Sequence, residues 1–199
     1  MGGPEAPERG GLGPYHAPVH RIPNVLASTR IALAPVVVAL ALADAPASLT
    51  AGLFAVAAAT DFFDGYLARK WEVTTVLGAF LDSTADKLLV TGSLLALIAL
   101  DRVSVWAALV IVMREFTVMA LRSLTAVEGT VVPPSAWGKV KAAAQFVAIF
   151  LAFMRWGGPV AGLFIDEWVM WIAVAITVAS GWGYLRAFFS HLQRASSRA

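Results

Sequence analysis

Four aspartates stand in an otherwise apolar stretch of the sequence: Asp61, Asp64, Asp82 and Asp86. A charge within an apolar segment of membrane-spanning length costs roughly 3 kcal/mol or more, so a function is the first hypothesis for each of them. Side chains three or four positions apart share one face of a helix, and the four therefore form two pairs. If the pairs face each other, two divalent cations would balance their charge. Carboxylate oxygens alone favour Mg²⁺, Mn²⁺ or Ca²⁺ over zinc.

Residues with little or no side chain accompany these aspartates. Gly65 and Ala68 follow Asp61 by four and seven positions. Gly78 precedes Asp82 by four positions. On helices, this spacing places the small residues on the same faces as the acids. They leave open space beside the carboxylates, enough for a flat ring or a chain of phosphates.

The whole segment fits the pattern D-x2-D-G-x2-A-R-x8-G-x3-D-x3-D at every specified position. The residues at these positions are Asp61, Asp64, Gly65, Ala68, Arg69, Gly78, Asp82 and Asp86. The pattern resembles the signature of the CDP-alcohol phosphatidyltransferases, which are integral membrane enzymes of phospholipid synthesis. Two other interpretations of the acids stay open: paired structural charges, or a proton relay inside a transporter.

The composition of the chain indicates a membrane protein. Of the 199 residues, 59% are hydrophobic and 14% are charged, with a mean hydropathy of +0.74. Soluble domains are on average far more polar. The apolar residues divide into several segments, each near the roughly 20 residues that cross a bilayer as a helix. Because the sequence contains no cysteine, disulfides and thiolate metal sites are excluded.

Six helices are expected from these apolar segments and the helix-breaking residues between them. Their ranges are about 24–43, 47–70, 75–100, 103–127, 136–156 and 166–189. Residues 1–18, rich in glycine and proline, are expected to be a disordered cytosolic tail. Residues 19–190 would form the six-helix transmembrane catalytic domain, and 191–199 a basic cytosolic tail. The predicted fold class is all-α, a polytopic membrane bundle of six transmembrane helices, and the resemblance implies the CDP-alcohol phosphatidyltransferase fold.

Lysine and arginine gather at one set of predicted helix ends. That set contains Arg9, Arg21, Arg69, Lys70, Arg122, Lys139, Lys141, Arg186, Arg194 and Arg198. The opposite set contains Arg102 and Arg155 beside the acids Asp44, Asp101, Asp166 and Glu167. Because basic residues favour the cytosolic side, we expect a multi-pass protein of the cytoplasmic membrane whose termini and motif face the cytosol.

Three further segments resemble those of the phosphatidylglycerophosphate synthases within this family. They are I-P-N-V-L-A-S-T-R at 22–30, R-E-F-T-V-M-A-L-R at 114–122 and G-K-V-K-A-A-A-Q at 138–145. Ala27 and Ala142 stand where those enzymes usually have threonine. The resemblance implies a set of basic residues that bind the phosphate of the acceptor: Arg114, Arg122, Lys139 and Lys141. Arg30 is assigned to the same set because its predicted depth in the membrane is similar.

Three of these assignments, those of Arg114, Lys139 and Lys141, have a plainer alternative without a role in phosphate binding. Lys139 and Lys141 could be ordinary positive-inside residues at the cytosolic mouth of the bundle. Glu115, next to Arg114, is interpreted as a structural partner of a neighbouring base rather than as a catalyst.

The resemblance implies a reaction in which CDP-diacylglycerol and sn-glycerol 3-phosphate give phosphatidylglycerol phosphate and CMP. Two ions of Mg²⁺ or Mn²⁺ are implied, bound by Asp61, Asp64, Asp82 and Asp86, with Asp86 also acting as the general base. The residues expected to contact the CDP-alcohol are Asp61, Gly65, Ala68, Arg69, Gly78 and Asp82. A homodimer in the lipid bilayer is implied, and no nucleic-acid partner is expected.

The signature leaves the acceptor open, because it contacts the CDP-alcohol that all family members share. The alternatives within the family are inositol phosphate, inositol, serine, and phosphatidylglycerol as in cardiolipin synthase. A more remote alternative is an ion-coupled transporter that uses the same acids for ion passage. Release of CMP from CDP-diacylglycerol separates the two classes, since a transporter would release none.

Overall fold

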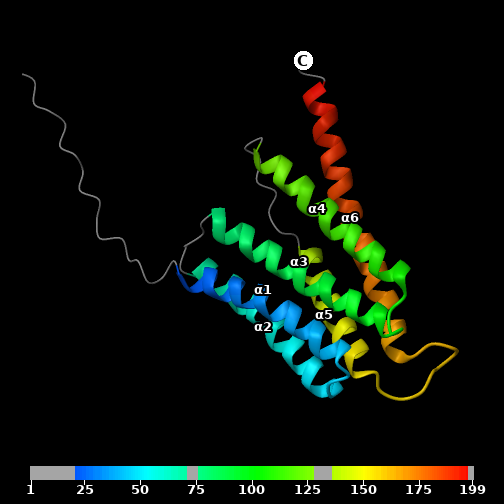
Figure 1. Ribbon diagram of the computed structural model, residues 1–199. Coiled ribbons are helices and arrows are strands. Elements are labelled where there is room, and N and C mark those ends of the chain that lie inside the picture. Colours follow the sequence, from blue (N-terminus) through cyan, green and yellow to red (C-terminus); the bar gives the residue numbers. More distant parts are fainter. Residues whose placement is uncertain (1–20, 71–75, 128–135, 197–199) are drawn as a thin grey trace, which may run out of the picture.

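The computed structural model describes residues 21–70, 76–127 and 136–196, although the side chains of some of them, including those of 61–82, lie outside the description. This part of the chain consists of six α-helices (Figure 1). They are α1 (Arg21–Leu42), α2 (Ala47–Lys70), α3 (Val76–Ala99), α4 (Val105–Val127), α5 (Ala136–Met154) and α6 (Ile165–Ser196). The prediction of an all-α fold with six helices is confirmed.

The helix boundaries differ from the predicted ones mainly at the two ends of the chain. Helix α1 begins at Arg21, so Pro23 lies in its first turn, where a missing backbone N–H costs no hydrogen bond. Helix α6 continues to Ser196 and therefore runs into the segment 191–199 that was expected to be a separate tail. The predicted tail at 1–18 lies outside the described residues.

Two of the described helices are long and apolar enough to cross a membrane by themselves. The segments concerned are Trp137–Met154 in α5 and Ile165–Gly183 in α6. Shorter apolar segments, Ala27–Leu42 and Ala47–Thr60, occur in α1 and α2. In α4 the apolar run is interrupted by charged side chains at 114, 115 and 122. The number of membrane crossings, six, stays a prediction.

Two of the connections are turns that contain an aspartate in the left-handed conformation. Asp44 has φ 55° after α1, and Asp101 has φ 53° after α3. The amide of the next residue donates to the carbonyl five positions earlier, at 3.1 Å in the first turn and 2.9 Å in the second. This hydrogen bond is that of a Schellman cap, which ends a helix and reverses the chain. Helix α2 therefore returns along α1, and α4 returns along α3.

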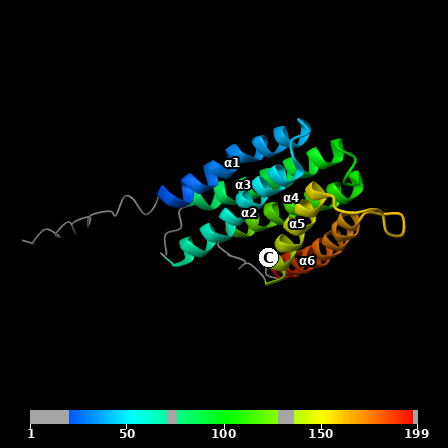
Figure 2. The same ribbon diagram turned by 90° about the horizontal axis from the view of Figure 1, so that it is seen from below.

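The six helices pack as two connected groups, α1–α3 and α4–α6 (Figures 1 and 2). Helix α1 packs against α2 and α3, whereas α6 packs against α4 and α5. The groups join where α5 contacts α2 and α3, and where α4 contacts α3. Helices α3 and α5 therefore contact helices of both groups, and side chains on them can meet partners from either side.

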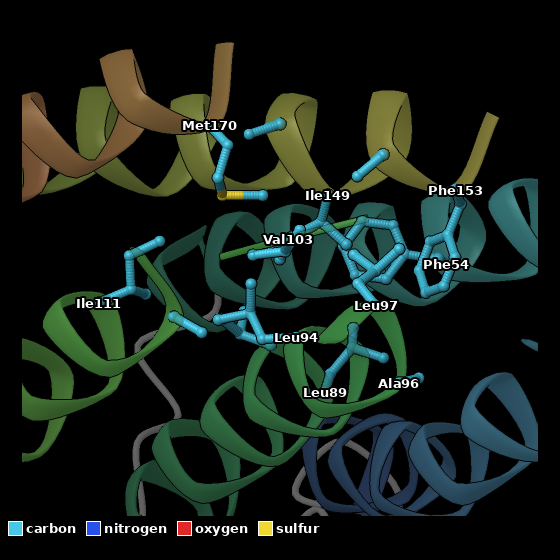
Figure 3. Packing of buried hydrophobic residues seen from close by; sticks show 14 of the residues in the cluster. Phe54, Leu89, Leu94, Ala96, Leu97, Val103, Ile111, Ile149, Phe153 and Met170 are labelled. Atoms are coloured by element: carbon cyan, nitrogen blue, oxygen red, sulfur yellow. The ribbon is translucent and has the colours of Figure 1, made fainter. Parts of the chain in front are cut away.

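The described core residues gather toward the end of the bundle that holds the connections 43–46, 100–104 and 155–164, and Figure 3 shows how several of them pack together. Phe54 of α2 packs edge-on against Phe146 and at a tilt against Phe153, with ring centroids 6.1 Å and 5.8 Å apart. Leu97 and Ile149 are fully buried beside them. Among the described residues, this end of the bundle has the dense packing of a structural core.

Arginine side chains tie the connections to the core at the same end. The Nη1 of Arg102 donates to the carbonyl of Phe153 at 2.7 Å, and it also reaches the carbonyl of Ala152 at 3.4 Å. These carbonyls belong to the last turn of α5 and have no partner within the helix. Arg155 pairs with Glu167 of α6 at 3.0 Å. The residues between α5 and α6 are thereby anchored to both helices.

Beyond the core, toward the motif, the buried surfaces of the helices turn from apolar to charged. We call this region the polar layer. Its described members are Arg30 on α1, Asp86 and Lys87 on α3, Arg114 and Glu115 on α4, Lys141 and Gln145 on α5, and Thr177 and Ser180 on α6. Arg30 is completely buried there, which is rare for a charged side chain without a specific role.

Candidate active site

The aspartate motif lies on two helices that contact each other. Asp61 and Asp64 belong to the second half of α2, while Asp82 and Asp86 belong to the first half of α3. Both halves of the motif are helical, so the prediction that each pair shares one face is confirmed for the backbone. The side chains of 61–82 lie outside the described part. The assigned roles of Asp61, Asp64, Gly65, Ala68, Arg69, Gly78 and Asp82 therefore stay predictions.

Asp86 is the one motif aspartate whose side chain is described, and it lies among charges from four helices. It interacts electrostatically with Lys87 on its own helix, with Lys141 on α5 and with Glu115 on α4. Arg30 on α1 also lies within electrostatic range. The motif and the basic segments, which are far apart in the sequence, therefore meet in the polar layer.

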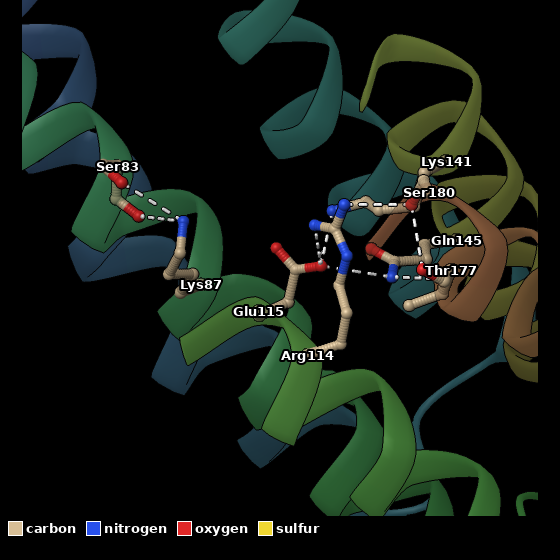
Figure 4. A network of polar contacts seen from close by, with 8 residues as sticks. All are labelled: Ser83, Lys87, Arg114, Glu115, Lys141, Gln145, Thr177 and Ser180. Atoms are coloured by element: carbon tan, nitrogen blue, oxygen red, sulfur yellow. Dashed lines mark hydrogen bonds and ion pairs between the residues drawn. The ribbon is translucent and has the colours of Figure 1, made fainter. Parts of the chain in front are cut away.

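Glu115 is at the centre of a buried ionic network (Figure 4). Its Oε1 accepts a hydrogen bond from the Nζ of Lys141 at 2.5 Å. The same oxygen is 3.4 Å from Nη1 of Arg114 and 3.4 Å from Nε2 of Gln145. Glu115 and Lys141 are each only 6% exposed. The interpretation of Glu115 as a structural partner of neighbouring bases is confirmed.

Helix α6 completes the network with two hydroxyl groups. The Nη2 of Arg114 donates to Oγ of Ser180 at 2.9 Å, and Nε2 of Gln145 donates to Oγ1 of Thr177 at 2.9 Å. Ser180 in turn donates to the backbone carbonyl of Thr177 at 2.9 Å. The guanidinium of Arg114 is thus held between its own helix and α6.

Gly181 lets the side chain of Arg114 pass close to the backbone of α6. A Cβ at this position would lie 3.1 Å from Cγ of Arg114 and 3.4 Å from its Nε. The 3.1 Å distance is shorter than the roughly 3.5–4.0 Å of an ordinary carbon contact, whereas the distance to Nε is that of an ordinary contact. The path of the Arg114 side chain therefore depends on a glycine one residue after its hydroxyl partner.

The sequence reasoning missed the contribution of α6, as well as that of Lys87 on α3. Ser180 and Gly181 follow Thr177 by three and four positions in an apolar stretch of α6, and this spacing is the signal that could have identified them. Lys87 directly follows the motif, and its Nζ donates to the backbone carbonyl of Ser83 at 3.2 Å and to its hydroxyl at 3.1 Å. The motif pattern ends one residue before this lysine.

The structure separates the five basic residues assigned to the acceptor into two sets. Arg30 and Lys141 are buried and Arg114 is mostly buried, all within the polar layer. Arg122 and Lys139 are exposed. Lys139 and Lys141 therefore have different environments, although the sequence places both near the cytosolic mouth of the bundle. Burial of Lys141 in an ion pair argues against the alternative that it is an ordinary positive-inside residue, whereas Lys139 fits that alternative.

The donor atoms of the motif fit a hard divalent cation. All four acids are aspartates on two contacting helices, and carboxylate oxygens are the ligands that Mg²⁺ and Mn²⁺ prefer. Among the side chains that the structure describes, no group of three or more acidic, histidine or cysteine residues comes together. Three of the four aspartates fall outside that description, so a metal site would be made by Asp86 together with them.

This arrangement of a two-helix aspartate motif and a buried basic layer is that of a known class of protein. The sequence profile of the CDP-alcohol phosphatidyltransferases matches residues 20–179, which extend from the start of α1 into α6. The chain belongs to this family, and the resemblance seen in the sequence is confirmed. The family is membrane-embedded and uses divalent cations.

Three relatives of known name are similar to this chain over most of its length. A protein of Bacillus subtilis named CDP-diacylglycerol–glycerol-3-phosphate 3-phosphatidyltransferase is 38% identical over 183 residues, covering 82% of this chain and 92% of the relative. A protein of the same name from Pectobacterium atrosepticum is 40% identical over 174 residues, covering 83% and 93%. A probable phosphatidylglycerophosphate synthase of Mycobacterium tuberculosis is 35% identical, covering 90% and 86%.

Proposed function

We propose that this protein transfers the phosphatidyl group of CDP-diacylglycerol to sn-glycerol 3-phosphate, giving phosphatidylglycerol phosphate and CMP. Relatives with 35–40% identity over most of the chain are named for this reaction. The single observation that carries the proposal is the position of Asp86. Its carboxylate lies within electrostatic range of the buried bases Lys141 and Arg30, so a group that can take a proton lies in the same layer as groups that can bind an anion.

The charge of the polar layer favours a phosphorylated acceptor. Its described cations are Arg30, Lys87, Arg114 and Lys141, and its described carboxylates are Asp86 and Glu115. Among these described side chains, which do not include those of Asp61, Asp64 and Asp82, four cations against two carboxylates leave a surplus of two positive charges. A phosphate monoester carries about 1.5 to 2 negative charges at neutral pH and would balance that surplus. Inositol and serine carry no net charge, and they would leave it uncompensated.

The chemistry requires alignment and charge neutralisation more than covalent participation by the protein. Asp86 takes the proton from the acceptor's hydroxyl, whose oxygen attacks the phosphorus that bears the diacylglycerol. The new phosphorus–oxygen bond replaces the bond to CMP, which leaves with the electron pair. Two bound Mg²⁺ or Mn²⁺ ions would neutralise the pyrophosphate and the leaving oxygen, held by Asp86 with Asp61, Asp64 and Asp82.

The remaining motif residues belong to the donor side of the proposed site. Gly65, Ala68 and Gly78 give room for the cytidine and its phosphates, and Arg69 contacts the nucleotide. Lys141, Arg114 and Arg30 hold the acceptor's phosphate. Arginine offers a planar fork to phosphate oxygens and lysine a mobile point charge, so the set suits a tetrahedral anion.

The proposal includes a placement in the cell. All six helices cross the cytoplasmic membrane, with the termini and the active site toward the cytosol. The acyl chains of the donor lipid then remain in the bilayer while its head group reaches the polar layer. The protein works as a homodimer. The lysine and arginine residues at the motif end of the bundle support this orientation.

An acceptor panel tests the proposal directly. The purified protein is given radiolabelled CDP-diacylglycerol with Mg²⁺ or Mn²⁺, and with glycerol 3-phosphate, inositol phosphate, inositol, serine or phosphatidylglycerol. We expect CMP release and a labelled lipid product with glycerol 3-phosphate. Preferential turnover of another acceptor would refute the acceptor assignment. Absence of CMP release with every acceptor would refute the reaction class and favour the transporter.

A further inference from the structure

We propose that Glu115 is a positioning residue for the acceptor's phosphate, which it serves by holding Lys141 and Arg114 in the orientation that binds it. This inference rests on the proposed function. The observation behind it is the convergence of three donors on one carboxylate oxygen, Oε1: the lysine at 2.5 Å, and Arg114 and Gln145 at 3.4 Å each. Glu115 itself does not need to contact the substrate.

Stability alone does not explain a buried ion pair at this position. The cost of removing two charges from water often equals or exceeds their mutual attraction, and apolar side chains of similar size pack as well. The neighbouring layer on the core side, which contains Ile111 and Ile149, consists of such apolar side chains. Glu115 lies one helical turn beyond Ile111 on α4, and Lys141 lies two turns before Ile149 on α5, where both are within electrostatic range of Asp86.

The hydrogen bond to Glu115 leaves Lys141 able to bind an anion. An ammonium group has three N–H donors, and within the described part of the chain Glu115 takes one of them. Asp86 attracts the same ammonium from α3. In Figure 4, Lys87 lies on one side of Glu115 and Lys141, Gln145 and Ser180 lie on the other. An acceptor phosphate bound by Lys141 would thus have Asp86 close to its hydroxyl.

The contacts to α6 make the arrangement rigid. Gln145 links Glu115 to Thr177, and Ser180 holds the second terminal nitrogen of Arg114 at 2.9 Å. Long basic side chains lose much rotational freedom when they bind a ligand, and a network that orders them beforehand strengthens binding. We therefore assign Glu115 the role of ordering the two bases before the acceptor arrives.

Glu115→Gln tests this role, because it keeps the shape of the side chain and removes its charge. We expect the KM for glycerol 3-phosphate to rise about tenfold, since the amide oxygen of glutamine accepts from Lys141 and Arg114 without the negative charge that strengthens these hydrogen bonds. The kcat and the KM for CDP-diacylglycerol should stay within about twofold. If the carboxylate merely reduced the positive charge of the layer, its removal would lower the acceptor KM instead. A lowered or unchanged KM would overturn the proposal.

Glu167→Gln is the matched control, because Glu167 pairs with Arg155 at 3.0 Å at the opposite end of the bundle. It should leave the acceptor KM unchanged. A rise equal to that of Glu115→Gln would show that the effect is merely structural, and would overturn the proposal. The kcat of wild type with glycerol 3-phosphate tests the proposed function separately, so a failure of the function and a failure of this inference are distinguishable.

A double variant shows whether Glu115 acts through Lys141. The KM increase of Glu115→Gln combined with Lys141→Met should be smaller than the product of the two single increases. A KM increase equal to the full product would mean that Glu115 and Lys141 act independently, and it would refute the positioning role of Glu115. If Glu115→Gln does not fold, Gln145→Met takes its place, with an expected rise of about threefold in the acceptor KM alone. No rise in that variant would overturn the inference.

Discussion

Gly181→Ala is the sharpest test of how the site is positioned, because it changes no charge and no hydrogen-bonding group. The added Cβ would lie 3.1 Å from Cγ, 3.4 Å from Nε and 3.9 Å from Cδ of Arg114. To restore an ordinary contact distance, the arginine side chain must move by about 0.4 Å or more. Its far end is held by Ser180 at 2.9 Å and lies 3.4 Å from Glu115, so the movement weakens those contacts.

The expected size of the effect follows from the contacts that Arg114 loses. A hydrogen bond to a charged group contributes about 1.5–3 kcal/mol, and partial loss of one corresponds to about a tenfold change in binding. We expect the KM for glycerol 3-phosphate to rise by about that factor, with the KM for CDP-diacylglycerol unchanged. Alanine also gains about 1 kcal/mol over glycine in a helix, so the free energy of unfolding should not fall sharply.

Gly183→Ala is the matched control on the same helix. A Cβ at Gly183 meets nothing within 4 Å, so this variant has the helix-propensity gain without the contact to Arg114. Steady-state kinetics with both substrates and thermal unfolding in detergent compare the two variants. If Gly181→Ala and Gly183→Ala have the same acceptor KM, then Arg114 does not bind the acceptor in the orientation described here.

Three further predictions follow from the site and the core. Asp86→Asn should abolish CMP release while CDP-diacylglycerol binding stays measurable; full turnover in this variant would exclude Asp86 as the base. Chelation of divalent cations should abolish activity and added Mg²⁺ or Mn²⁺ should restore it, whereas activity that survives exhaustive chelation would contradict a metal-dependent mechanism. Arg102→Ala should lower the free energy of unfolding by about 1.5–3 kcal/mol, because the 2.7 Å hydrogen bond to Phe153 is lost, with kcat unchanged at low temperature. Unchanged thermal stability would show that this capping contact is replaced by water.

The course of the chain was predictable because the signals for helices are local. Apolar segments of about 20 residues and breakers such as Pro46 and Gly157 predict where helices begin and end, and the structure agrees closely with these positions. The motif was predictable for the same reason, since its positions lie within 26 consecutive residues of two helices. Family membership required nothing more than this local pattern.

The partners of the charged residues depended on tertiary structure. Lys139 and Lys141 look alike in the sequence, but residues two apart in a helix point to different sides, so one is exposed and the other is buried. Which side is buried depends on how α5 packs against α2, α3 and α6. The pairing of Lys141 with Glu115 spans 26 positions, and that of Arg114 with Ser180 spans 66.

The sequence by itself determined the helices, the motif and the class of chemistry, because each depends on neighbours along the chain. The folded bundle decided which bases are buried beside Asp86 and which contact solvent. It also decided that Gly181 is in contact with Arg114 while Gly183, on the same helix, is not. These choices depend on the rotation and packing of whole helices, which bring together residues too far apart in the sequence for any local pattern to connect.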